Sequence, residues 1–361
     1  MRRTRKIPIA LSSGRAQRER VSKGWPRVLR YAALCAALST SGVCFAEPAQ
    51  LKFGSTAPPM SVMNSQIWAP WIKDVEGDAD GALAIQLFTG NSLGTVYNIY
   101  DRTLNRVADI SFGLFGPLTD QFPRTMVVSQ PFERQSARAA SLALTRLVRN
   151  GTIAEEYKNI KPLALFVMSG SVIHSKKPVK SLADLRGLKV ATEARLNAQI
   201  LERLGGTPVT MVPPEMYQSL QRGVVEGTAI GWQAVGSFKF DEVTSAHLGE
   251  VMSTSPAYVF MNKESFASLP EKARAAIERH SGESFARRVT SVTLRMEQDQ
   301  LARVSALPGH VLNRLDPAEL ARWKELTAPL TQEWLKTTPD GERVLAAYRA
   351  ELAKLEEEQS R

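Results

Sequence analysis

Residues 182–232 read LADLRGLKVATEARLNAQILERLGGTPVTMVPPEMYQSLQRGVVEGTAIGW, and this stretch decides the fold. Three short apolar segments, residues 188–192, 207–212 and 224–232, are typical of strands. The segments between them have the length and composition of helices. Strands that alternate with helices of about ten residues indicate βαβ units on a parallel sheet.

Glycine and proline set the boundaries of these predicted helices. The first helix, residues 195–204, is followed by Gly205 and Gly206, and glycine readily adopts the positive φ found after a helix C-terminus. The second helix begins at Pro213 and Pro214, because proline suits a first helical turn. We therefore predict an α/β fold built around this stretch.

The C-terminal ends of these strands are the predicted ligand edge, since open parallel sheets bind ligands there. Ala191 and Thr192 end the first strand, and Trp232 and Gln233 follow the third. Arg195 opens the helix that follows the first strand. These five residues are candidate ligand contacts.

The formal charge of +10 is concentrated at the N-terminus. Residues 1–46 hold ten of the 46 basic residues and one of the 36 acidic residues, which leaves 36 basic and 35 acidic residues in the remainder. A nearly neutral body gives no electrostatic reason to expect nucleic-acid binding. Basic residues, an apolar run from Tyr31 to Leu38 and the small residue Ala46 predict a signal peptide over residues 1–46, cleaved after Ala46.

Cysteine and histidine usage argues against a metal or thiol site. Cys35 and Cys44 both lie in the predicted leader, so the mature chain is expected to contain neither disulfides nor a cysteine nucleophile. The four histidines lack metal-site spacing along the sequence and are interpreted as isolated residues. We expect no metal and no cofactor.

The rest of the chain predicts two lobes, each made from discontinuous sequence. Residues 163–174 form a long apolar strand that would cross from one lobe to the other, and residues 258–262 would cross back. The expected lobes are residues 47–168 with 256–297, and residues 169–255 with 298–361. A helical pattern from Pro270 to Leu307 is long enough to span both lobes, although Gly282 could kink it. Two crossings are typical of a hinged protein.

The first lobe repeats the βαβ pattern and adds three candidate contacts. Phe112 and Phe115 follow its third strand, and Asn91 follows its second. Aromatic side chains at strand ends can enclose an organic ligand and exclude water. The alternative for Phe112 is ordinary core packing.

Gly90-Asn91-Ser92-Leu93-Gly94 matches the G-x-S-x-G pattern of a nucleophile elbow. A secreted serine hydrolase that uses Ser92 is therefore the alternative function. It would also require a histidine, and no glycine-rich oxyanion loop precedes the match. A strand-to-helix turn is the structural interpretation, and its helix N-terminus could contact an anion.

DLRGLKV, GGTPVTMVPPEMYQSLQRGVVEG and the aromatic turn at Trp232 resemble the solute-binding proteins of tripartite ATP-independent (TRAP) transporters. The resemblance runs from Leu51 to the last helices. It implies a two-lobe fold like that of periplasmic binding proteins, with hinge strands and a long helix that spans the lobes. It also implies that the chain is not an enzyme, and that it captures a small organic acid in the periplasm and delivers it to one small and one large integral membrane permease subunit.

This sequence departs from the family at its polar anchors. The arginine that usually clamps the ligand carboxylate corresponds to Ala191, a second ligand arginine falls near Ser171, and the family asparagine falls at Ile230. Either Arg195 takes over the carboxylate, or Thr192, Ser171, Gln233 and backbone amides bind it without arginine. The apolar replacements favour a less charged ligand, such as an aromatic or branched monocarboxylate.

Overall fold

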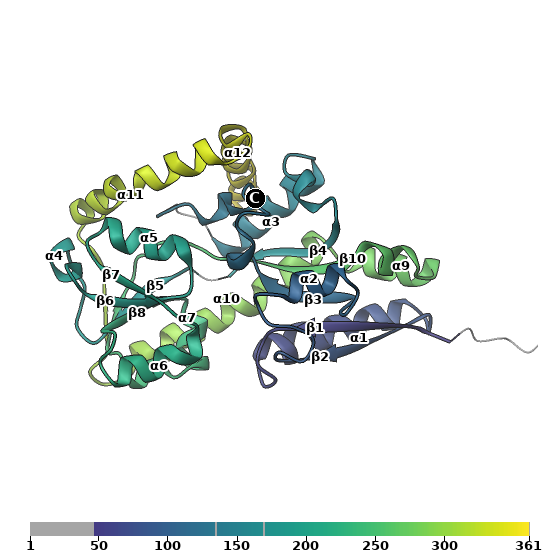
Figure 1. Ribbon diagram of the computed structural model, residues 1–361, viewed down its shortest axis with the longest axis horizontal. Helices are drawn as coiled ribbons and strands as arrows, with labels where there is room; N and C mark the ends of the chain where they lie inside the picture. Colours follow the sequence, from purple (N-terminus) through teal and green to yellow (C-terminus); the bar gives the residue numbers. More distant parts are fainter. Residues whose placement is uncertain (1–46, 134–135, 169, 361) are drawn as a thin grey trace, which may run out of the picture. The chain divides into compact units, whose positions relative to one another are not determined.

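The structure is a computed structural model that describes residues 47–133, 136–168 and 170–360 (Figure 1). The predicted signal peptide and both cysteines lie outside the described residues. Within the described part, no helix combines the length and the apolar character needed to cross a membrane.

The first lobe is built on a five-stranded sheet with the order β2-β1-β3-β10-β4. β1 runs parallel to β2 and β3, whereas β10 is antiparallel to β3 and β4. The strands are β1 (Ala49–Ser55), β2 (Leu83–Phe88), β3 (Ile110–Leu114), β4 (Ile160–Val167) and β10 (Pro256–Asn262).

The second lobe is built on a six-stranded sheet with the order β11-β9-β5-β8-β6-β7. β6 is parallel to β7 and β8, and β5 is antiparallel to β8 and β9. The strands are β5 (Val172–Ser175), β6 (Lys189–Thr192), β7 (Thr207–Thr210), β8 (Gly227–Ile230), β9 (Ala246–Leu248) and β11 (Val311–Asn313). With α5 (Arg195–Arg203) and α6 (Pro213–Gln221) between its parallel strands, this lobe confirms the βαβ prediction for residues 182–232.

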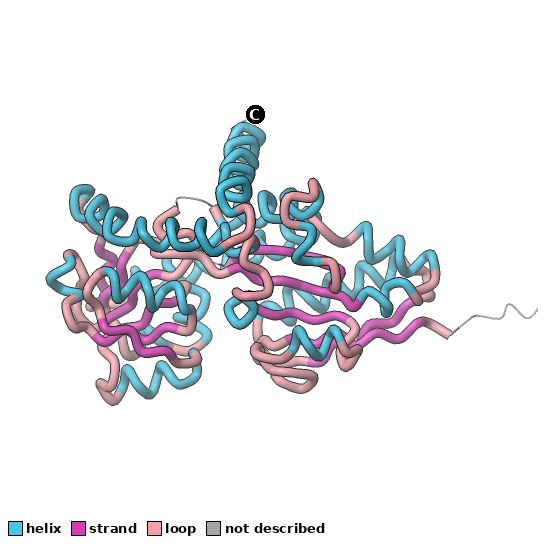
Figure 2. The backbone as a smooth tube through the Cα atoms, turned by 45° about the horizontal axis from the view of Figure 1, so that its top comes forward, coloured by secondary structure: helices cyan, strands magenta, loops and turns pink. Residues whose placement is uncertain are grey.

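Helices flank both sheets, and the C-terminal helix projects away from them (Figure 2). The α-helices are α1 (Ala69–Asp78), α2 (Ile99–Leu104), α3 (Ala137–Arg149), α4 (Leu182–Leu185), α7 (Trp232–Ser237), α8 (Lys263–Ala267), α9 (Glu271–Arg279), α10 (Glu283–Ser305), α11 (Pro317–Thr337) and α12 (Gly341–Ser360). The short π or 3₁₀ turns are η1 (Met63–Trp68), η2 (Gly116–Leu118), η3 (Thr125–Ser129), η4 (Ala154–Tyr157) and η5 (Phe240–Glu242).

Two of the segments at which the chain passes between the lobes pair with each other. One joins β4 to β5 and the other joins β9 to β10. The backbone N–H of Met168 donates to the carbonyl of Ser255 at 2.9 Å, and that of Ser171 donates to the carbonyl of Ser253 at 2.8 Å. The discontinuous lobes predicted from the sequence are therefore present.

A loop from the first lobe adds a third connection. The Phe132 ring lies 6.3 Å from the Trp323 ring of α11, within the core of the second lobe. The Phe132 N–H donates to the carbonyl of Met252 at 2.9 Å. The φ of Phe132 is 53°, a left-handed conformation that is uncommon for a bulky residue. Interlobe packing therefore holds this residue in an unfavourable backbone region.

The long helical pattern is interrupted at Gly282, whose φ is 68°. α9 ends before it and α10 begins after it, because a left-handed residue cannot continue an α-helix. α10 still contacts α3 and β4 of the first lobe and α7 of the second. The predicted lobe-spanning helix is thus α10 alone.

The C-terminal helix differs from the expected lobe boundaries, which assigned residues 298–361 to the second lobe. α12 packs on α3 of the first lobe. Val344, Tyr348 and Leu355 of α12 are almost fully buried in the core beside α3. Their spacing of four and seven residues forms one apolar helix face, which is buried against α3.

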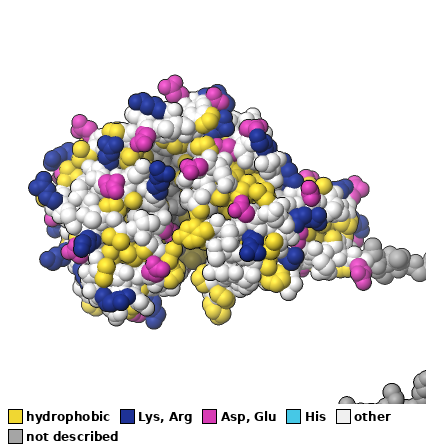
Figure 3. Space-filling model, in the orientation of Figure 1, with side chains coloured by type: hydrophobic (Ala, Val, Ile, Leu, Met, Phe, Trp, Pro, Cys, Tyr) yellow, Lys and Arg dark blue, Asp and Glu magenta, His cyan; other side chains and the backbone are white. Residues whose placement is uncertain are grey.

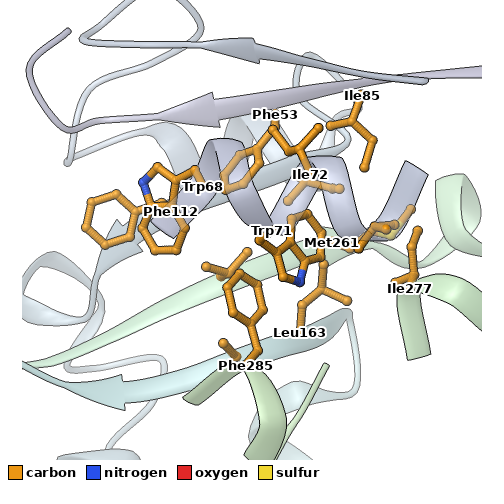
Figure 4. Close-up of a cluster of buried hydrophobic side chains, with 14 of the residues drawn as sticks. Phe53, Trp68, Trp71, Ile72, Ile85, Phe112, Leu163, Met261, Ile277 and Phe285 are labelled. Carbon is orange, nitrogen blue, oxygen red and sulfur yellow. The ribbon is translucent and has the colours of Figure 1, made fainter. Parts of the chain in front are cut away.

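The core on the other face of the first sheet is aromatic (Figure 4). Trp71 of α1 stacks on Phe285 of α10 with ring centroids 4.7 Å apart and an interplanar angle of 3°. Trp68 contacts both Phe53 and Phe112. These rings attach α1 and α10 to the sheet.

Candidate functional site

Two parallel strands of the second sheet bring the predicted ligand residues to one edge. β6 ends at Thr192 and its neighbour β8 ends at Ile230, with Ala191 in register with Thr228. Arg195 begins α5 just beyond Thr192, and Trp232 begins α7 two residues after Ile230. The edge formed by residues 191–195 and 230–233 is called the ligand edge below.

The ligand edge has buried walls and one accessible cation. Ala191 and Thr192 are fully buried, and the Thr192 hydroxyl accepts a hydrogen bond from the Ala194 N–H at 3.4 Å. Arg195 is exposed and has no ion-pair partner among the described residues. Its guanidinium is therefore available to a carboxylate.

Glu193 lies between these groups. Solvent reaches part of this residue, yet the protein around its carboxyl group raises the pKa by desolvation. Glu193 therefore places a carboxyl group at the ligand edge, two residues before Arg195. Sequence reasoning missed Glu193, although its place directly after a strand end was visible.

Ser171 is placed by a buried polar network. The Asn197 side chain on α5 donates to the Ser171 hydroxyl at 2.8 Å and accepts from the Ser253 hydroxyl at 2.6 Å. All three residues are buried. Ser171 and Ser253 lie on the two segments that join the lobes. Asn197 therefore links α5 to both segments by hydrogen bonds. Sequence reasoning missed Asn197 also.

Gln233 and Trp232 begin α7 and contact different partners. The Gln233 amide donates to the Thr293 carbonyl of α10 at 3.4 Å. The Trp232 ring is buried, with its centroid 4.7 Å from the His174 ring and 5.1 Å from the His247 ring. α7 is therefore held on one side by α10 and on the other by histidines.

Three histidines form a continuous chain, so the prediction that each histidine is isolated is wrong for these three. His174 Nδ1 lies 2.8 Å from His247 Nδ1, and His247 Nε2 lies 3.0 Å from His310 Nδ1. His174 Nε2 lies 3.3 Å from the Ile230 carbonyl at the ligand edge. That carbonyl only accepts, so His174 donates from Nε2, and in neutral rings His247 and His310 each donate inward from Nδ1.

Burial keeps the inner histidines neutral. Desolvation lowers the pKa of His174 to about 3, with a further contribution from His247. Desolvation also lowers the pKa of His247 to about 4. Within the described part of the chain, no group of three His, Asp or Glu side chains is arranged to hold a metal ion.

The candidates from the first lobe occupy different environments. Phe112 is buried in the aromatic core, 5.1 Å from Trp68. Phe115 is fully buried and packs edge-on against Phe122 and Tyr258. Asn91 is exposed in the turn after β2. Of these three side chains, only that of Asn91 presents polar atoms to solvent.

Ser92 lacks the surroundings of a catalytic serine. Its hydroxyl donates to the Thr89 carbonyl at 2.6 Å in an exposed turn. Three of the four histidines bond in the chain described above, and His280 bonds Asp78 at 2.8 Å. No described histidine is placed to act as a base for Ser92, so the geometry gives the hydrolase alternative no support.

Comparison with known proteins identifies the family. The model of the family described as bacterial extracellular solute-binding protein, family 7, matches residues 53–337. The chain belongs to this family. It is thus a solute-binding protein of the TRAP type, a family of receptors for small organic acids rather than of enzymes, as the resemblance implied.

Relatives match over most of their length. The Comamonas testosteroni protein named outer membrane transporter protein TsaT is 28% identical over 334 residues, which cover 89% of this chain and 97% of the relative. A marine metagenome TRAP solute-binding protein specific for aromatic acid ligands, solved with 3-hydroxybenzoate, is 28% identical with a TM-score of 0.79, covering 85% of this chain and 98% of that chain.

A second solved structure comes from Rhodoferax ferrireducens. This TRAP solute-binding protein contains copurified benzoate. It is 28% identical with a TM-score of 0.75, covering 84% of this chain and 98% of that chain.

Proposed function

We propose that this chain is a periplasmic receptor for aromatic monocarboxylates of the benzoate class. It captures the ligand between its two lobes and delivers it to the membrane permease subunits of a TRAP transporter. The observation that carries the proposal is the ligand edge, which offers one accessible arginine, Arg195, together with the carboxyl group of Glu193 and otherwise apolar or uncharged residues. The ligands of the two relatives at 28% identity support the same class.

The charge count favours one carboxylate rather than two. A dicarboxylate needs two cationic partners, whereas the family's two arginine positions correspond here to Ala191 and to the neighbourhood of Ser171. Arg195 is the cation left at this edge. A benzoate needs only one such partner, because its ring gains free energy from leaving water.

Each candidate has a role in this proposal. Arg195 binds the carboxylate, while Thr192, Ser171 and Gln233 supply or support polar contacts beside it. Trp232, Ala191, Phe112 and Phe115 form the apolar walls or the packing behind them. Asn91 faces the ligand from the first lobe. Binding to both lobes stabilises the closed form, because only that form makes both sets of contacts.

The predicted leader and the family description support secretion into the periplasm. The nearly neutral body also fits a freely diffusing receptor. Figure 3 shows basic and acidic side chains interspersed over the face in view, without a continuous patch of one sign. We propose that the permease subunits recognise the closed lobes rather than a strongly charged surface.

A thermal-shift and calorimetry series tests the ligand class. Benzoate and 3-hydroxybenzoate are expected to raise the Tm, and succinate is not. A ligand present at 100 times its Kd stabilises the folded protein by about 2.7 kcal/mol. Arg195→Ala should raise the Kd for benzoate about tenfold, which corresponds to about 1.4 kcal/mol.

Arg203→Ala is the matched control, because Arg203 is an exposed arginine at the other end of the same helix. It should leave the Kd for benzoate unchanged. If succinate raises the Tm and the aromatic acids do not, the proposal of an aromatic monocarboxylate ligand is refuted. If Arg195→Ala and Arg203→Ala change the Kd for benzoate equally, Arg195 is not part of the site.

A further inference from the structure

A cationic cavity lies between α3 and α10, and its lining shares no residue with the ligand edge. Its volume is about 390 Å³. The lining residues are Ser136, Arg138, Ser291, Leu294, Arg295 and Gln298. Among the described residues of this lining, the two arginines are the only charged ones, and none is a carboxylate.

The geometry of both helices directs these groups into the cavity. Ser291, Arg295 and Gln298 are spaced by four and three residues and therefore share one face of α10. Arg138 lies in the first turn of α3, and its Nη2 donates to the Ser291 hydroxyl at 3.1 Å. The two arginines thus approach the same space from two helices.

Neither arginine has a counter-ion among the described residues. Arg138 and Arg295 take part in no ion pair of the described part, although Asp299 follows Arg295 by one turn. The Nε of Arg138 is buried and has no hydrogen-bond partner. A buried donor without an acceptor is costly, and charged donors are the costliest. The Arg138 guanidinium is therefore charged, partly buried and without a carboxylate partner in the described part of the chain.

The N-terminus of α3 strengthens this electrostatic preference. α3 has 13 residues, and its first turn contains no acidic side chain. The Ser136 hydroxyl accepts from the Ala139 N–H at 3.0 Å. The positive end of the helix dipole adds to the two guanidinium groups and favours an anion.

We propose that this cavity binds a small oxyanion, a phosphate, sulfate or carboxylate group, between Arg138 and Arg295. The bound anion would join the start of α3 to α10 at the point where α10 leaves the first lobe. Because it binds the folded chain only, it would stabilise the folded state by an amount that rises with the logarithm of its concentration above its Kd. The site is distinct from the ligand edge and does not depend on the identity of the transported solute.

Calorimetry with sodium phosphate, sulfate and acetate tests the proposal, at constant ionic strength kept with sodium chloride in a zwitterionic buffer. We expect saturable binding of at least one oxyanion. Arg295→Gln and Arg138→Gln should each raise the Kd at least tenfold, because each removes one of two charged donors. Arg203→Gln, on α5, is the control and should leave the Kd unchanged.

The binding of oxyanions and of benzoate by the arginine variants separates this site from the ligand edge. Absence of saturable oxyanion binding, or equal weakening by Arg203→Gln, would overturn the proposal. Arg295 is exposed, so its variant is expected to fold even if that of Arg138 does not. Benzoate binding that is lost in Arg195→Ala but kept in Arg295→Gln would support two sites, whereas loss of phosphate binding in Arg195→Ala alone would refute the second one.

Discussion

The first sheet is packed mainly with aromatic rings, whereas the second sheet buries a row of histidines and hydroxyl groups. Phe53, Trp68 and Phe166 belong to the aromatic core of the first lobe. His174, His247 and Thr228 are buried in the second. Apolar burial is nearly insensitive to pH, but buried imidazoles are neutral only while protons are scarce. Both lobes have apolar cores, but the second also buries imidazoles, whose contribution to stability depends on pH.

Removing one ring from the first lobe should have the largest effect. Trp71→Ala deletes a fully buried ring that stacks on Phe285, and it leaves the His280 carbonyl without its 2.8 Å donor. We expect the free energy of unfolding to fall by about 3–5 kcal/mol in urea denaturation. The loss should be the same at pH 7 and pH 5.

Tyr97→Ala serves as the aromatic control for that substitution. Tyr97 is 66% exposed, so its removal should change the free energy of unfolding by less than about 1 kcal/mol. A loss of under 1 kcal/mol for Trp71→Ala would show that the first lobe is not stabilised by this stack.

Acid should destabilise the protein through the second lobe. The pKa values of His174 and His247 are lowered to about 3 and about 4, below the value of about 6.5 in an unfolded chain. The unfolded state therefore binds more protons, and the stability present above pH 6.5 is lost as the pH falls toward 4. The two histidines together should lower the free energy of unfolding by about 2.5 kcal/mol between pH 6 and pH 5.

Urea denaturation at several pH values measures this slope. His247→Gln should remove about half of the histidine contribution to this slope, because glutamine does not titrate and its amide can still donate and accept. Trp71→Ala lowers stability without changing the slope. If the free energy of unfolding falls by the same amount between pH 6 and pH 5 in His247→Gln and in the parent chain, the histidine chain is not the source of the pH dependence.

Local patterns predicted the fold well because they need only neighbouring residues. The βαβ alternation over residues 182–232 follows from glycine, proline and apolar spacing, and it placed Thr192, Arg195 and Trp232 at one edge. The Gly282 break was visible as a kink but not as two helices. The packing of α12 on α3 was missed, because an apolar helix face does not specify which surface covers it.

Contacts between distant strands could not be predicted in this way. His174, His247 and His310 are separated by 73 and 63 residues, so their chain depends on the register of β5 and β9 and on the position of His310 before β11. The Asn197 network likewise joins residues 26 and 56 positions away. Buried polar partners are set by tertiary structure, and a single sequence contains no local signal for them.

The Asn197 network gives the smallest of the three expected effects and tests how the second lobe is fastened to the hinge. Asn197→Ala removes two buried hydrogen bonds and leaves the hydroxyls of Ser171 and Ser253 without this partner. We expect a loss of about 2 kcal/mol in the free energy of unfolding, because buried polar groups without partners are costly. Benzoate affinity should fall as well, since α5 carries Arg195.

Asn91→Ala removes the same side chain from an exposed turn, and its stability should change by less than about 0.5 kcal/mol. Urea denaturation and calorimetry with benzoate measure both variants. If Asn197→Ala weakens benzoate binding while stability is unchanged, Asn197 acts on the ligand directly. If stability falls and affinity is kept, the network holds the second lobe together without positioning Arg195, and the polar interior of that lobe would then be structural, like the aromatic interior of the first.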